Sequence, residues 1–141
     1  MPLCGGFKLK MLEELSMSNL DTFNEITAKV LAACYANFPA PLDCDQNEYI
    51  SGTDTEPNEI FYETMMWLKK YDYITFWEPE LGPRTFYHVQ LTEKGISVLN
   101  MIPDSLKEKV TMGSKIASAV KAGAKDIMSE CIRQAVKYSL N

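Results

Sequence analysis

Residues 67–100 read WLKKYDYITFWEPELGPRTFYHVQLTEKGISVLN, and this stretch decides the fold. Tyr73–Trp77 and Thr85–Leu91 are rich in aromatic and β-branched residues, which favours strands. The intervening EPELGPR contains two prolines and one glycine, so we expect a solvent-facing hairpin with its tip there. Strict alternation divides the second strand between two faces, with Tyr87, Val89 and Leu91 on one and Phe86, His88 and Gln90 on the other.

Helices are predicted on both sides of this hairpin. The one before it should begin near Pro57, with Thr55 as its N-cap. The one after it should be capped by Thr92 and end at Pro103, and Gly95 would let its backbone pack closely against the sheet. The apolar stripes of the two helices are Ile60, Phe61, Thr64, Met65, Leu68 and Tyr71 in the first, and Ile96, Val98, Leu99 and Ile102 in the second.

Further out, Asn19–Phe38 has apolar residues at intervals of three and four, which predicts an amphipathic helix ended by Pro39. Residues 39–56 have no period and are rich in Pro, Gly, Asp and Asn, so we expect a long loop with at most one short strand or turn of helix. Residues 1–18 show no convincing period either. We interpret them as a poorly ordered N-terminal extension.

Residues 104–141 form a predicted C-terminal helical extension. From Gly113 a narrow stripe follows, and the glycine at position 123 indicates either a break or a close packing contact. Such a helix would fold back onto the rest of the chain or pair with a second copy, so a homodimer is expected. The stripe consists of Ile116, Val120, Ile127, Cys131 and Ala135.

The order helix, loop, helix ending in WLKKYDYITF, hairpin and HVQLTEKGISVLN resembles bacterial winged helix-turn-helix domains over about residues 19–103. Its most specific parts are Trp67-Leu68 followed by Tyr73-Ile74, and the run LTEKG at 91–95. The resemblance implies a mostly α fold with a small β-hairpin (α+β), a winged-helix domain over 19–103. The family normally has a compact helix before its recognition helix, where this chain has an acidic, loop-like segment.

The resemblance implies a cytoplasmic, DNA-binding transcription regulator. Residues 58–71 would be the recognition helix and residues 78–84 the wing tip, and the N-terminal part of such a helix enters the major groove. Bases would be read by Tyr62 and Met66, and phosphates would be contacted by Lys69, Lys70 and Arg84.

The charge pattern favours a different partner. The net charge is −5, and residues 42–65 contain seven Asp and Glu without any Lys or Arg. Phosphates would repel such a segment, which weakens the DNA hypothesis. The alternative is a protein-interaction module that engages a basic protein through the acidic segment and exposed hairpin aromatics. Its candidate residues are Asp43, Asp45, Glu48, Glu59, Glu63 and Trp77.

The sequence gives no foundation for catalysis, a metal site or a cofactor. His88 is the single histidine, and no nucleotide-binding or hydrolase motif is found. Cys34 and Cys131 lie on apolar stripes and should be buried free thiols, whereas Cys44 is the one cysteine expected to be exposed. No apolar run reaches the roughly 18 residues that a transmembrane helix needs. We therefore expect a non-enzymatic protein without a membrane partner.

Overall fold

The computed structural model describes residues 2–50, 58–77, 84–103 and 110–140, with side chains from residue 19 onward. The described chain is mostly helical with a small antiparallel sheet, which confirms the α+β class. Thr55, Pro57 and most of the expected hairpin tip lie outside these residues. In chain order the elements are α1 (Pro2–Asn37), β1 (Leu42–Asp45), α2 (Gln46–Tyr49), α3 (Glu59–Lys70), β2 (Ile74–Trp77), β3 (Thr85–Leu91), α4 (Glu93–Asn100), α5 (Met112–Ala122) and α6 (Lys125–Ser139).

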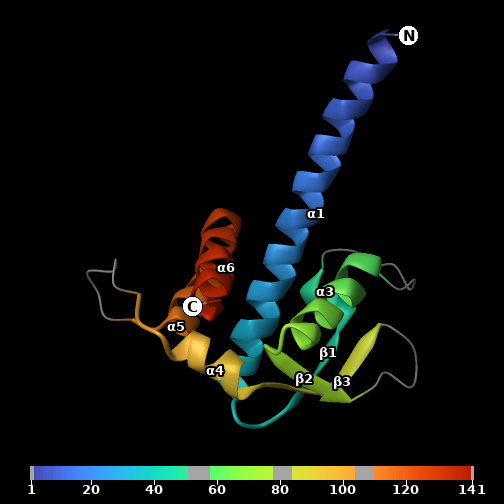
Figure 1. Ribbon diagram of the computed structural model, residues 1–141. Coiled ribbons are helices and arrows are strands. Elements are labelled where there is room, and N and C mark those ends of the chain that lie inside the picture. The colour runs from blue at the N-terminus through green and yellow to red at the C-terminus, as the bar shows by residue number, and fades with distance from the viewer. Residues whose placement is uncertain (1, 51–57, 78–83, 104–109, 141) are drawn as a thin grey trace.

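The second half of α1 is the central element of the core. Figure 1 shows it between the α5–α6 pair on one side and α3 with the sheet on the other. Ile26, Val30 and Cys34 are almost fully buried, as their spacing predicts. The helix begins at Pro2 and not at Asn19, so residues 2–18 continue it.

The C-terminal residues fold back onto α1 as two helices. Gly123 ends α5 with φ of 67°, a conformation that glycine adopts without strain, so the break expected there is confirmed. The break changes which side of α6 faces the core: Met128 and Ile132 are buried, whereas Ile127 is 49% exposed. The prediction that Ile127 belongs to the apolar stripe of the C-terminal extension was therefore wrong. Gly113 is a packing contact, since a Cβ there would lie 2.6 Å from the Tyr35 ring.

The loop expected over 39–56 contains both a strand and a short helix, more than the sequence indicated. β1 pairs with β3, and the sheet order is β1-β3-β2. Asp45 stabilises both elements: its Oδ2 accepts the Asn47 N–H at 3.1 Å at the start of α2, and its Oδ1 accepts the Thr85 hydroxyl at 2.6 Å. Asp45, a residue type common in loops, therefore caps α2 and links β1 to β3 through its side chain.

Strict alternation along β3 was wrong because the strand contains a bulge. Thr75 pairs with Gln90 and Trp77 with Tyr87, so β3 has one residue more than β2 over this interval. His88 takes up the extra residue with φ of 58°. Phe86 consequently lies on the buried side with Val89 and Leu91.

The end of α3, the start of β2 and the start of α4 meet at one junction. The Tyr73 N–H donates to the Leu68 carbonyl at 2.8 Å, and the Tyr73 carbonyl accepts the Thr92 N–H at 3.1 Å. Thr92 caps α4 as predicted, its hydroxyl accepting the Gly95 N–H at 3.0 Å. A Cβ at position 95 would lie 2.2 Å from the Tyr73 carbonyl oxygen, so the expected close approach of Gly95 is confirmed.

Two boundary expectations at these helices need correction. Asn58 is the N-cap of α3, its side chain accepting the Phe61 N–H at 2.9 Å, so the cap is not Thr55. Tyr71 and Ile102 were assigned to buried stripes, but they are 45% and 50% exposed. Both residues follow the last turn of a helix, where the helical period no longer sets the direction of a side chain.

The Gly95→Ala substitution should lower the free energy of unfolding by about 2–3 kcal/mol, because a backbone oxygen cannot move away from the new methyl group. Urea denaturation measures the change. Ser97→Ala, at an exposed position of the same helix, is the control and should stay within about 0.5 kcal/mol of the unmodified protein. Equal stability of both variants would contradict the close approach.

The bulge predicts an unusual ranking at position 88. His88→Gly should be more stable than His88→Ala by about 1 kcal/mol, since glycine adopts positive φ without strain. Both substitutions remove the imidazole ring, so the difference in stability between the two variants reports the backbone conformation of residue 88. Thermal unfolding of the two variants gives the comparison, and a more stable alanine variant would show that residue 88 is ordinary extended strand.

Candidate functional site

A groove of about 740 Å³ lies between α1 and α3. Its apolar residues are Phe23 from α1 and Ile60, Met66 and Trp67 from α3, and all four are only partly buried. The Phe23 ring meets the Trp67 ring edge to face, with 5.1 Å between centroids. The remaining lining residues are polar or charged: Asn19, Glu59, Glu63, Thr64 and Lys70.

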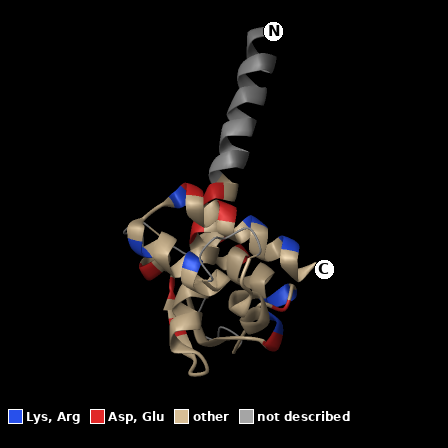
Figure 2. Ribbon diagram, turned by 90° about the vertical axis from the view of Figure 1, so that its left-hand side faces the viewer, with Lys and Arg blue, Asp and Glu red and all other residues tan. Residues whose placement is uncertain are grey.

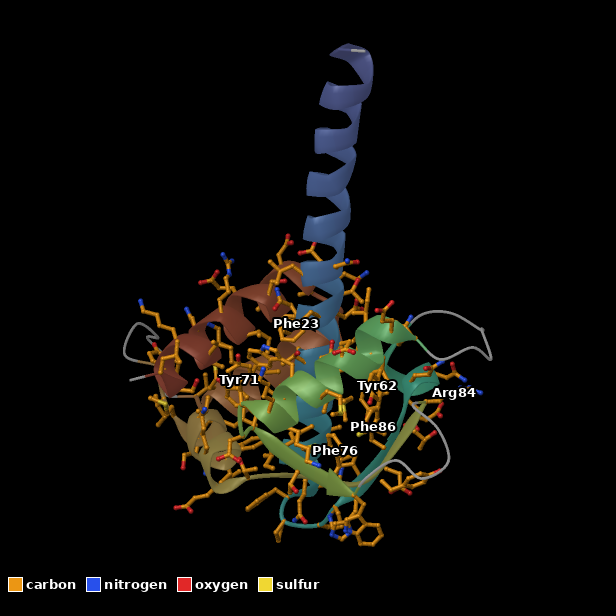
Figure 3. All side chains as sticks on the ribbon, turned by 45° about the vertical axis from the view of Figure 1, so that its right-hand side comes forward. Phe23, Tyr62, Tyr71, Phe76, Arg84 and Phe86 are labelled. Carbon is orange, nitrogen blue, oxygen red and sulfur yellow. The ribbon has the colours of Figure 1, made fainter. Side chains whose placement is uncertain are left out.

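The opposite side of α3 is filled by aromatic packing against the sheet. Phe61 meets Phe86 edge to face at 5.7 Å, and Phe76 meets Phe86 in the same way at 4.8 Å. Figure 3 shows Phe23 on one side of α3, and Phe76 and Phe86 on the other. The groove side of α3 is therefore the side that remains open to a ligand.

Of the residues proposed to contact DNA, the four on α3 follow one face of the helix at spacings of three and four, whereas Arg84 does not belong to this helix. Tyr62 lies over Phe86, with 5.9 Å between rings, and the Lys69 ammonium lies 4.6 Å from the centre of the Phe76 ring. Met66 and Lys70 line the groove. Arg84 precedes β3, where its carbonyl accepts the Gln46 N–H at 2.9 Å.

Charge is separated along α3. Glu59 and Glu63 lie in its first half and are exposed, whereas Lys69 and Lys70 form its last turn. Lys94 joins the basic end, where its ammonium donates to the Tyr71 carbonyl at 2.8 Å. This arrangement complements the helix dipole. Elsewhere, Figure 2 shows Lys and Arg interspersed with Asp and Glu on the side in view.

The five acidic residues proposed to bind protein fall into three places. Asp43 and Asp45 are engaged by the sheet, since Asp43 accepts the His88 N–H at 3.2 Å and Asp45 accepts the Thr85 hydroxyl at 2.6 Å. Glu48 is exposed on α2. Glu59 and Glu63 line the groove, and they are the pair that the structure brings together with apolar side chains.

Trp77 lies apart from the groove, on the outer face of the hairpin. It is 63% exposed and stacks on the His88 ring at 4.3 Å with 2° between the planes. An exposed aromatic residue on the hairpin was expected, and Trp77 confirms it. Most of the other hairpin aromatics are buried, including Tyr73, Phe76 and Phe86.

The groove was not predicted from the sequence. Ile60 was assigned to the apolar stripe of the helix before the hairpin, and Asn19–Phe38 was treated as a separate amphipathic helix. Each assignment was reasonable within its own helix. The groove arises because two helices that are distant in sequence pack side by side, and periodicity within a single helix does not report that.

The three cysteines whose side chains the structure describes do not offer a nucleophile. Cys34 and Cys131 are buried as expected, but Cys44 is buried as well, because its side chain points into the core from β1. Burial raises the pKa of the Cys44 thiol to about 11, and a hydrogen bond with Tyr49 offsets part of that rise. The expectation that Cys44 is exposed was wrong.

Two further properties follow from the described part of the chain. It contains no cluster of His, Cys, Asp and Glu side chains that could hold a metal ion. Within the same residues, no helix combines the length and the apolar character needed to cross a membrane.

Comparison of the chain with family models, curated proteins and solved structures found no match. The function is therefore argued from the residues of this chain.

Cys44 should resist aromatic disulfide reagents at pH 8 in the native state, since both burial and the raised pKa keep the thiolate scarce. A Cys4→Ser background removes the one cysteine whose side chain is not described. Native protein should then release almost no chromophore, and denatured protein should release that of the three remaining cysteines. Ser114→Cys, at an exposed position, is the positive control. Rapid native labelling of Cys44 would place it in an open loop.

Proposed function

We propose that this chain is a non-enzymatic, winged-helix-like regulatory module that uses the groove side of α3 to bind another protein. The observation that carries the proposal is the charge of that side: Glu59 and Glu63 are exposed beside apolar residues in the first half of the helix. In winged-helix proteins that bind DNA, this half approaches the phosphates. Carboxylates there oppose DNA and favour a basic protein.

Several features support the winged-helix resemblance. A short helix, α2, precedes α3, where the sequence indicated a loop with at most one short strand or turn of helix. The hairpin β2–β3 follows α3 directly, and Thr92 caps the next helix. These features support the fold only and do not distinguish a protein partner from DNA. The charge of α3 is the observation that distinguishes them.

The non-enzymatic part of the proposal rests on the state of the reactive groups. The three described thiols are buried, and burial is the main cause that raises the pKa of each. The His88 ring is stacked on Trp77 and is not paired with any of these thiols among the described contacts. A nucleophile and base within hydrogen-bonding distance are what covalent catalysis requires.

A DNA-binding regulator is the second candidate, and one observation favours it. Lys69, Lys70 and Lys94 gather at the C-terminal end of α3, where they could contact phosphates. They lie at the end of the helix opposite to the one that reads bases. Non-specific affinity would then be weak, and it would fall with salt less steeply than in proteins that contact many phosphates.

The two candidates are separated by DNA binding in a salt titration with mixed-sequence duplexes. The proposal predicts no measurable affinity even at about 50 mM salt. Replacing the two carboxylates with Glu59→Lys and Glu63→Lys should create salt-dependent binding, because the repulsion becomes attraction. Fluorescence anisotropy of a labelled duplex measures both.

The matched control places the same charge change elsewhere, with Glu93→Lys and Asp126→Lys at exposed positions of α4 and α6. It should bind more weakly than the α3 double variant. Tight binding by the unmodified chain would refute the protein-binding proposal and establish the second candidate.

A further inference from the structure

We infer that the occupant of the α1–α3 groove is an amphipathic helix of a partner protein, with apolar residues on one face and Lys or Arg beside them. This inference rests on the proposed function and specifies its partner. It is carried by three properties of the groove: its exposed apolar floor, the absence of converging polar groups within the described lining, and its acidic rim.

The floor consists of side chains that the core does not fully cover. Phe23 and Trp67 pack edge to face, and Ile60 and Met66 flank them, each with part of its surface open. Helix-binding grooves present this kind of surface to residues spaced three and four apart. Methionine adapts its shape to such side chains because it is unbranched and flexible.

A polar small molecule fits the lining less well than a helix. Small-molecule sites usually contain a few polar groups that converge on the ligand. Here Thr64 is the buried polar residue of the lining, and its hydroxyl already donates to the Ile60 carbonyl at 2.6 Å. The other polar lining groups are the charged side chains of α3 and Asn19, which is exposed.

The acidic rim of the groove, formed by Glu59 and Glu63, favours a positively charged occupant. Glu59 and Glu63 are one turn apart, and neither has an ion-pair partner among the described residues. Among the described lining residues the one cation is Lys70, which lies at the other end of α3. The described polar residue that α1 contributes is the neutral Asn19. Lys or Arg of the partner would therefore lie over the first half of α3, with its apolar face toward Phe23 and Trp67.

Trp67 provides a direct probe of the groove. The chain has two tryptophans, so Trp77→Phe leaves Trp67 as the only source of tryptophan emission. A synthetic helical peptide of Leu and Lys, with the leucines on one face, should shift Trp67 emission to shorter wavelength and saturate. A peptide in which every Lys is replaced by Glu keeps the apolar pattern and should bind at least about tenfold more weakly.

Variants in the same background locate the binding. Glu59→Lys with Glu63→Lys should raise the Kd of the Leu/Lys peptide at least about tenfold. Glu93→Lys with Asp126→Lys makes the same change in net charge away from the groove and should alter the Kd much less. Equal weakening by the two pairs, or a response to the peptide that does not saturate, would overturn the inference.

Two other outcomes are distinguishable. If Trp67 emission changes with protein concentration in the absence of peptide, and sedimentation shows a dimer, a second copy fills the groove and the partner-helix inference is wrong. If the peptide fails to bind while the chain also fails to bind DNA, the groove inference falls and the proposed protein-binding function stands.

Discussion

The close approach of α4 to the turn between α3 and β2 constrains much of the structure. The Tyr73 N–H donates to the Leu68 carbonyl at the end of α3, and the Tyr73 carbonyl accepts the Thr92 N–H. Gly95 packs so closely against this carbonyl that no side chain would fit. Three elements are thereby fixed at one point. The hairpin has to lie against one side of α3, where Phe61, Phe76 and Phe86 fill the interface.

This constraint determines which surface is available for binding. Because the sheet covers one side of α3, the other side faces α1, and the space between the two helices is the groove. The carboxylates of the first turns are on that open side, and the lysines are at the opposite end. The first half of α3, where the winged-helix hypothesis would place base contacts, thus presents carboxylates to the groove.

The local part of this fold could be predicted from the sequence. The hairpin, α3 and the Thr92 cap depend on residues close together in the chain, so turn residues and periodicity indicate them. Residues 39–56 were expected to hold at most one short strand or turn of helix, because the four residues of β1 pair with the distant β3 and its aspartates act as bonding partners of that strand and of α2. The same missing pairing made Cys44 look exposed. The bulge at His88 and the groove depend on tertiary packing, which no single-segment pattern contains.

Methyl NMR of methionine tests the central claim most directly, namely that the groove side of α3 binds a basic amphipathic helix and not DNA. Met66 lines the groove, and the adjacent Met65 is fully buried, so the pair provides a probe and an internal reference on one helix. The account predicts that a basic amphipathic helix shifts the Met66 methyl signal much more than that of Met65, and that duplex DNA shifts neither. A Met66 methyl signal that does not shift when the peptide is added, or that shifts when duplex DNA is added, would contradict the account.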